Sequence, residues 1–273
     1  MSLTAVYNGT LSRVELSADS LGATATYAIV ESSANQVLWD TVRGGTALLV
    51  SSQEAQLDDY EFYADAQTHY RITSFNADDE QQAQFTTSIT VDLDGRVWLK
   101  SIKHPNLNQI VTVADYGDIE LAGRSFPVPI SGRSLPVGLS EVAGGRDHPL
   151  VVATDNPAAE AKLMLSLRAG GVWFVHVPTD PPTGREGNAL LPGSMHVLID
   201  TARVHRLGGV SRYQHYVLPL RETAPPAPEI VGTTLAWETV KRLYGSWNAV
   251  WAAHQSWREV WDLIADPSDV VPT

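Results

Sequence analysis

Histidines and carboxylates are the residues of this chain whose types could support metal or acid–base chemistry. The chain has eight histidines and no cysteine, which excludes disulfides, thiolate metal sites and cysteine nucleophiles. No HxH, HxxxH or HExxH spacing occurs. His196 and His205 are nine residues apart on or beside one expected strand, so they should point to opposite faces. We therefore expect no metal site.

Catalytic motifs are equally sparse. Neither a G-x-S-x-G elbow nor a phosphate-binding loop is present. The stretch 92–95 (DLDG) begins like a calcium loop, but residues 98–105 supply no later acidic ligand. Asp115, Asp118 and Glu120 could pair as the carboxylates of a glycoside hydrolase, and spacing alone does not exclude this. Three carboxylates beside a glycine turn are more typical of a solvated surface, so we expect neither an enzyme nor a cofactor.

The charges divide the chain unevenly. Residues 1–88 carry twelve acidic and three basic side chains (net −9), residues 89–224 carry thirteen of each, and residues 225–273 carry six and three (net −3). This distribution and the length of 273 residues favour more than one domain, although an ordinary acidic surface would also explain the charge. The few basic side chains of the first part argue against nucleic-acid binding. No apolar run reaches the roughly 18 residues of a membrane helix.

Residues 1–88 are expected to form a β-sandwich. Short β-forming segments recur about every ten residues from residue 11, separated by turn residues that include Asp58-Asp59. The order Trp39, Leu57, Tyr70 resembles a fibronectin type III or immunoglobulin-like domain, which implies a tryptophan in an early strand and a tyrosine near the start of a late one. Residues 76–84 (NADDEQQAQ) are expected to be a linker or an exposed turn.

Residues 89–224 are expected to form a β-barrel or sandwich that carries one helix. Asp94-Gly95 predicts a hairpin within residues 88–101. The helix is bounded by cap signals, which are Asp155 or Asn156 with Pro157 at its start and Gly170-Gly171 at its end. A loop rich in proline and glycine follows from Pro178 to Ser194. Its Leu190 and Leu191 are candidate contacts to a neighbouring subunit, unless the loop is a mobile surface segment.

Residues 225–273 begin with a proline-rich stretch and end in a repeat. The sequence APPAPEI (224–230) predicts an extended spacer that carries the segment away from the barrel. The decads AWETVKRLYG, SWNAVWAAHQ and SWREVWDLIA then align with a period of ten. Gly245-Ser246 and the pair Ser256 and Glu259 favour two or three short helices with glycine and serine caps.

Two columns of the repeat predict a packing unit. Trp237, Trp247 and Trp257 share one column, and Val240, Val250 and Val260 share another. We expect both columns to be buried as packing anchors, either against the chain's own barrel or against a neighbouring subunit. Trp251 and Trp261 depart from the repeat, because Lys241 fills the first copy of their column, and are candidate partner contacts.

Four further stretches resemble the distal tail and minor tail proteins of long-tailed (siphovirus-type) bacteriophages, especially those of actinobacteria. They are VWLKSIKHPNLNQIV (97–111), GRSLPVGLSEVAGGRDHPLVV (132–152), GGVWFVHVP (170–178) and RYQHYVLPLRETAPPAP (212–228). The SW..V decads resemble the TW..V decads that often follow this barrel. The resemblance covers about two thirds of the chain, and the fibronectin-like domain in front departs from it.

The resemblance implies a structural role and no catalysis. It implies a barrel that assembles as a homo-oligomeric ring at the distal end of the tail tube in the virion tail tip, commonly six-fold, with a three-fold ring as the variant. The implied partners are the tail tube protein, the tape measure protein and other tail-tip proteins, without direct nucleic-acid binding or membrane insertion. The alternative is a module that binds host-surface carbohydrate, which exposed tryptophans at a shallow site would favour.

Overall fold

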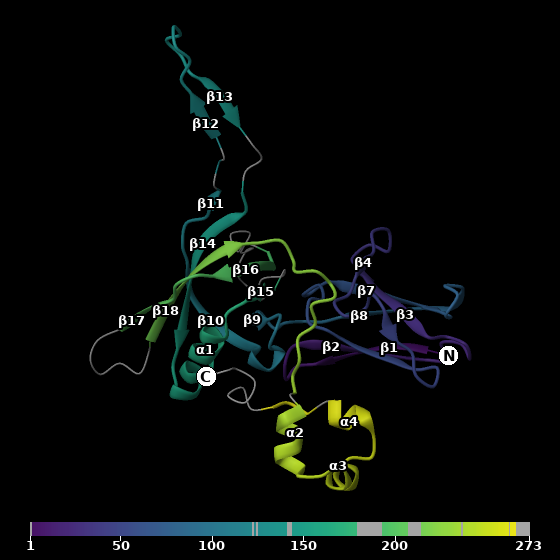
Figure 1. Cartoon of the computed structure of the whole chain (residues 1–273). Coiled ribbons are helices and arrows are strands. Elements are labelled where there is room, and N and C mark those ends of the chain that lie inside the picture. Colours follow the sequence, from purple (N-terminus) through teal and green to yellow (C-terminus); the bar gives the residue numbers. More distant parts are fainter. Residues whose placement is uncertain are drawn as a thin grey trace.

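The computed structural model describes residues 2–121, 123, 125–140, 144–178, 193–206, 214–235, 237–261 and 263–265. Two β units lie side by side, a sandwich at the N-terminus and a barrel in the middle, and three short helices gather near their junction (Figure 1). The predicted mainly-β fold, with one helix on the barrel and short helices at the C-terminus, is confirmed.

The sandwich packs a three-stranded sheet, ordered β1-β2-β6, against a sheet ordered β4-β3-β7-β8 in which β5 also pairs with β3. Its strands are β1 (Ser2–Asn8), β2 (Arg13–Asp19), β3 (Tyr27–Ser33), β4 (Asp40–Thr41), β5 (Leu48–Leu49), β6 (Ala55–Asp59), β7 (Gln67–Phe75) and β8 (Gln81–Thr90). Alternate residues of β2 and β7 face inward, as in Val14, Leu16, Tyr70 and Ile72, and build one core from both sheets. Division into two antiparallel sheets around one core is the architecture of immunoglobulin-like sandwiches.

Two predictions about the sandwich need correction. Trp39 does not lie in an early strand: it lies outside the strands, half-buried, with the Arg71 guanidinium 4.3 Å from its ring centroid. The sandwich core contains aliphatic side chains together with Phe62, Tyr70 and Trp98. Asp58-Asp59 is not a turn but the end of β6.

The boundary between the two units also differs from the prediction. Residues 76–80 form an exposed turn, but β8 begins at Gln81 and pairs along β7, so no linker exists there. The predicted boundary at residue 88 therefore falls inside β8. Asp94-Gly95 does not join a hairpin, because β8 pairs with β7 whereas the next strand, β9, belongs to the barrel.

The barrel is a ring of six strands in the order β14-β10-β9-β15-β16-β18, closed by pairing of β14 with β18. Two further strands, β11 and β17, pair outside the ring. The bounds are β9 (Val97–Ser101), β10 (Gln109–Tyr116), β11 (Glu120–Leu121), β14 (Arg146–Thr154), β15 (Val172–His176), β16 (Met195–Ile199), β17 (Arg203–Arg206) and β18 (Gln214–Glu222). A 3-10 turn, η1 (Pro105–Leu107), connects β9 to β10. Inward side chains of every barrel strand fill the interior, so the barrel has a packed core.

Helix α1 (Pro157–Ala169) packs on the barrel as predicted. The Asn156 side chain accepts a hydrogen bond of 2.8 Å from the backbone N–H of Ala159, and Gly170 ends the helix with a φ of 63°. Leu163 is fully buried in the barrel core. The cap residues and the apolar stripe together fix both the ends and the orientation of this helix.

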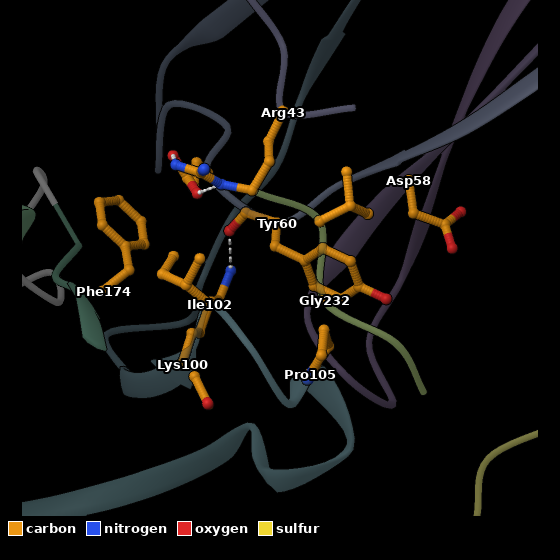
Figure 2. A pocket seen from close by; sticks show the side chains of 11 residues that line it. Arg43, Asp58, Tyr60, Lys100, Ile102, Pro105, Phe174 and Gly232 are labelled. Carbon is orange, nitrogen blue, oxygen red and sulfur yellow. Dashed lines mark hydrogen bonds and ion pairs between the residues drawn. The ribbon is translucent and has the colours of Figure 1, made fainter. Parts of the chain in front are cut away.

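A buried lysine joins the sandwich to the barrel. Lys100 of β9 donates hydrogen bonds of 2.7 Å from Nζ to the carbonyl oxygens of Tyr60 (Figure 2) and Ser12. Its Nζ also lies 4.6 Å from the ring centroid of Phe62. Trp98, two residues earlier on β9, points to the same side as Lys100 and packs in the sandwich core. One face of a barrel strand therefore anchors the sandwich, while its alternate residues Val97 and Leu99 fill the barrel core.

Asp59 is a second buried charged group at this junction. Its carboxylate accepts hydrogen bonds of 2.7 Å from the Tyr70 hydroxyl and 2.8 Å from the Glu61 backbone N–H. Burial raises the pKa of Asp59 to about 6, although these hydrogen bonds and the Lys100 charge act to lower it. Burial likewise lowers the pKa of Lys100 well below its ordinary value, against the attraction of Asp59 and Glu61.

The proline-rich segment is not a free spacer. Residues 224–232, here called the strap, lie against the sandwich–barrel junction. The Arg43 guanidinium pairs with Glu61 (Nε to Oε1, 2.6 Å) and donates from Nη1 to three carbonyl oxygens of the strap. Those carbonyls belong to Pro226, Ala227 and Ile230, at 3.2, 2.8 and 3.2 Å. Proline lacks an N–H donor, but its carbonyl still accepts, which is how an extended proline-rich chain can be held.

We predict that replacing Asp59 by asparagine changes how stability depends on pH. The folded-state pKa of Asp59 is about 6, above the unfolded value of roughly 3.9. The protonated side chain therefore contributes its full stability below about pH 3.9, and this contribution is lost as the pH rises through 6. Relative to Asp59→Asn, the parent should lose about 2–3 kcal/mol of unfolding free energy between pH 4 and 7. Denaturant unfolding across this range measures the difference.

The exposed Asp94 supplies the control. Asp94→Asn removes a carboxylate whose side chain is 79% exposed, so its stability should stay parallel to the parent's. Parallel curves for the parent and Asp59→Asn would contradict the assignment of Asp59 as a buried, titrating group.

Candidate functional site

The sandwich–barrel junction contains a cavity lined by charged residues, but this cavity is too small for a ligand. Arg43, Glu61, Tyr60 and Lys100 line it together with apolar side chains that include Phe174 (Figure 2). Its volume is about 30 Å³. One water needs roughly 10–15 Å³, so the cavity has room for little more than water. The charged side chains bond to one another and to backbone carbonyls, so we assign this cavity a structural role.

The histidines and carboxylates considered as metal ligands or catalytic groups are not brought together by the fold. Among the residues that the structure describes, no group of three or more potential metal ligands is found. His196 and His205 lie on two different strands, β16 and β17, and not on one strand as predicted. His196 pairs with Glu61 of the sandwich at 3.2 Å, while His205 lies opposite His215 on β18.

The three candidate carboxylates are exposed. Asp115 is near the end of β10, Asp118 follows that strand, and Glu120 begins β11. They lie where the chain leaves the barrel for the projecting segment described below. No helix in the described part of the chain is long and apolar enough to span a membrane.

The C-terminal decads fold into three short helices, each beginning at a repeat tryptophan. They are α2 (Trp237–Tyr244), α3 (Trp247–Ala253) and α4 (Trp257–Trp261). Ser246 caps α3 by accepting from the Ala249 N–H, and Gly245 before it has a φ of 67°. At α4, the Glu259 N–H donates to Ser256 Oγ at 3.3 Å. The prediction of short, separately capped helices is confirmed.

The valine column forms the centre of this module. Val240, Val250 and Val260 are buried against one another, with Leu235 and Leu263 beside them. A backbone hydrogen bond of 3.0 Å from Ala265 N–H to the Thr234 carbonyl brings the end of the module back to its start. The valines are therefore packing anchors, as predicted.

The prediction that the tryptophan column is buried is wrong. Trp237, Trp247 and Trp257 are 64%, 61% and 57% exposed. A helical side chain leans over the preceding turn, and the first residue of a helix has no such turn to cover. Each indole instead contacts the next one edge to face, with ring centroids 5.7 Å apart for the first pair and 6.1 Å for the second. The small interior between the three helices is filled by the valines, with Leu235, Tyr244 and Leu263 packed against them.

Of the four predicted contact residues, the structure describes the side chain of Trp251. Trp251 is 62% exposed, and its ring centroid lies 5.8 Å from that of Trp257, so it extends the tryptophan surface. The side chain of Trp261 lies outside the described residues. So do Leu190 and Leu191 and most of the predicted contact loop, residues 179–192.

A groove opens between the first two decads. We call it the tryptophan groove; its volume is about 380 Å³, and it is lined by Trp237, Val240, Lys241, Gly245, Ser246, Trp247 and Val250. Two indoles at 65° to each other form its walls. It is more than ten times larger than the junction cavity and falls within the roughly 300–1,000 Å³ of small-molecule sites.

A second apolar surface lies on a projecting hairpin that the sequence did not reveal. Strands β12 (Ser125–Val128) and β13 (Val137–Ser140) pair with each other and extend away from the barrel (Figure 1). We call residues 120–140 the arm. Directly opposite residues share a face, so Phe126 and Leu139 lie beside Val128 and Val137 on one side, and all four are exposed. The other side carries serine, proline and glycine.

We predict that valine, and not tryptophan, holds the C-terminal module together. Val250→Ala removes two methyl groups from a three-valine core and should cost about 2 kcal/mol, enough to unfold so small a unit. Trp247→Ala, at an exposed position, should leave it folded. Limited proteolysis with mass spectrometry should detect early cleavage after the strap in Val250→Ala only. The reverse pattern would contradict the valine core.

Comparison with protein-family models and with curated proteins found no match to this chain. Its function must therefore be inferred from the two apolar surfaces, the face of the arm and the tryptophan groove.

Proposed function

We propose that this protein is a structural component of the tail tip of a long-tailed bacteriophage. Its barrel joins other copies in a ring at the distal end of the tail tube, six-fold in the commonest arrangement. The sequence resemblance suggests this role, and the observation that best supports it is the arm, whose ordered apolar face has no partner among the described residues of its own chain.

The arm has the properties of an intersubunit element. A two-stranded hairpin is marginally stable in water unless its apolar face packs on something. Full burial of an apolar side chain such as Phe126 or Leu139 stabilises by about 1.5–3 kcal/mol, so docking of the four-residue face would order the hairpin. Monomers rarely leave an ordered apolar surface uncovered.

A second copy is the occupant that best fits the arm. The six strands of the closed ring leave no edge for adding a neighbour's strand. The strands outside the ring, β11 and β17, have only 2 and 4 residues, and such short edge strands pair poorly with another chain. A projecting arm that reaches one neighbour, while a different surface receives the arm of another, is a heterologous contact, and such contacts generate rings. The balanced charge of residues 89–224 suits packing of like copies, because it avoids net repulsion.

The remaining parts fit around such a ring. The sandwich carries a net charge of −9, which suits the solvent-facing outside. The proposed partners are the tail tube protein, the tape measure protein and other tail-tip proteins, and the proposed location is the virion tail tip after synthesis in the host cytoplasm. In this role the protein binds no cofactor and performs no catalysis.

We predict that charges on the apolar face of the arm abolish assembly. The double variant Phe126→Asp and Leu139→Asp should remain folded, since both side chains are exposed, but should sediment as a 29.7 kDa monomer where the parent forms a ring. Analytical ultracentrifugation and negative-stain imaging measure both states.

Leu38 provides a matched control, because it is also exposed but lies in the sandwich. Leu38→Asp should assemble like the parent. A parent that stays monomeric at every concentration, or a double variant that still forms rings, would refute the proposed role of the arm.

A further inference from the structure

We propose that the tryptophan groove is a binding site for a neutral pyranose sugar of a surface glycan. This site is separate from the arm and does not depend on ring assembly. Exposed aromatic rings, an apolar floor and polar rim groups meet here around a volume large enough for a small ligand.

The shape of the groove suits a single ring-shaped ligand. The indoles of Trp237 and Trp247 stand 5.7 Å apart at 65°, which makes a V and not a flat platform. The buried Val240 and Val250 close the floor. A sugar ring at the end of a glycan, or in a bend of it, can enter such a V, whereas a flat extended polysaccharide cannot lie on both faces at once.

The chemistry of the walls matches a pyranose. One face of a pyranose exposes C–H groups, which are attracted to the negative face of an aromatic ring, and its rim carries hydroxyl groups. In the part of the chain that the structure describes, the indole N–H groups of Trp237 and Trp247 have no hydrogen-bond partner, so they can donate to sugar hydroxyls. Ser246 accepts from the Ala249 N–H and keeps its own O–H free to donate.

The charges of the groove and of the whole chain restrict the class of ligand further. Lys241 is the one charged residue among those that line the groove, so an aromatic cage for a quaternary ammonium is disfavoured. The net charge of −12 on the whole chain opposes a polyanionic glycan at moderate ionic strength. A neutral sugar avoids both penalties.

Titration of the full-length protein with neutral hexasaccharides tests this site. Cellohexaose, chitohexaose and maltohexaose vary linkage and N-acetylation, and binding is followed by tryptophan fluorescence and confirmed by calorimetry. We expect at least one to bind saturably, and Trp237→Ala and Trp247→Ala each to weaken it about tenfold or more, because each removes one stacking surface. Trp247→Phe, which keeps an aromatic face, should weaken it less.

Trp251→Ala is the matched control, since Trp251 is 62% exposed in the same module but does not line the groove. It should bind like the parent. Limited proteolysis of each variant checks that the module stays folded, and sedimentation follows ring assembly separately, which Trp237→Ala should leave intact.

Three results would overturn the proposal. The first is no saturable binding of any hexasaccharide, and the second is binding that Trp237→Ala and Trp247→Ala leave unchanged. The third is loss of self-association in these two variants, which would identify the groove as a contact between copies.

Discussion

Pairing of β14 with β18 is the interaction on which the rest of the structure depends. It runs from the pair Asp147 and Arg221 to the pair Thr154 and Gln214 and converts an open sheet into a closed barrel. At its end the Arg146 guanidinium and backbone N–H bind the Glu222 carboxylate at 2.8–2.9 Å, which lowers the pKa of Glu222 to about 2. The arm comes just before β14 in the chain, and the strap comes just after β18. Pairing of these two strands therefore fixes where the arm and the strap start.

The sandwich–barrel junction then fixes where the other parts lie. Lys100 inserts a barrel side chain beneath two sandwich carbonyls, and Trp98 places a barrel residue in the sandwich core. Arg43 ties the strap to the same place. Buried charged groups of this kind are costly unless fully bonded, and removing one partner leaves the other stranded. The junction therefore resists rotation of one unit against the other, and the C-terminal module starts from a fixed point.

Local rules of the sequence predicted much of this fold. The caps of α1 and the valine column followed from short-range patterns, because caps and helical spacing act within a few residues. Predictions that depended on long-range partners failed. Trp39, Asp94-Gly95 and the strap were misassigned because the partner that decides each of them, such as Arg71 for Trp39, is distant in the chain. The tryptophan column was wrong for a different reason: its period correctly indicated a repeated unit, but period alone does not show which column faces inward. In the sequence, the arm appears only as a run of alternating apolar residues, and a buried strand has the same pattern.

The central claim is that copies of this chain form a ring in which the arm packs on a neighbour. Particle imaging of the assembled protein, at a resolution that separates side chains, tests it most directly. The account predicts several copies around one axis, with Phe126, Val128, Val137 and Leu139 of each copy buried against the next. A ring in which these four side chains face solvent, or particles without rotational symmetry, would contradict it.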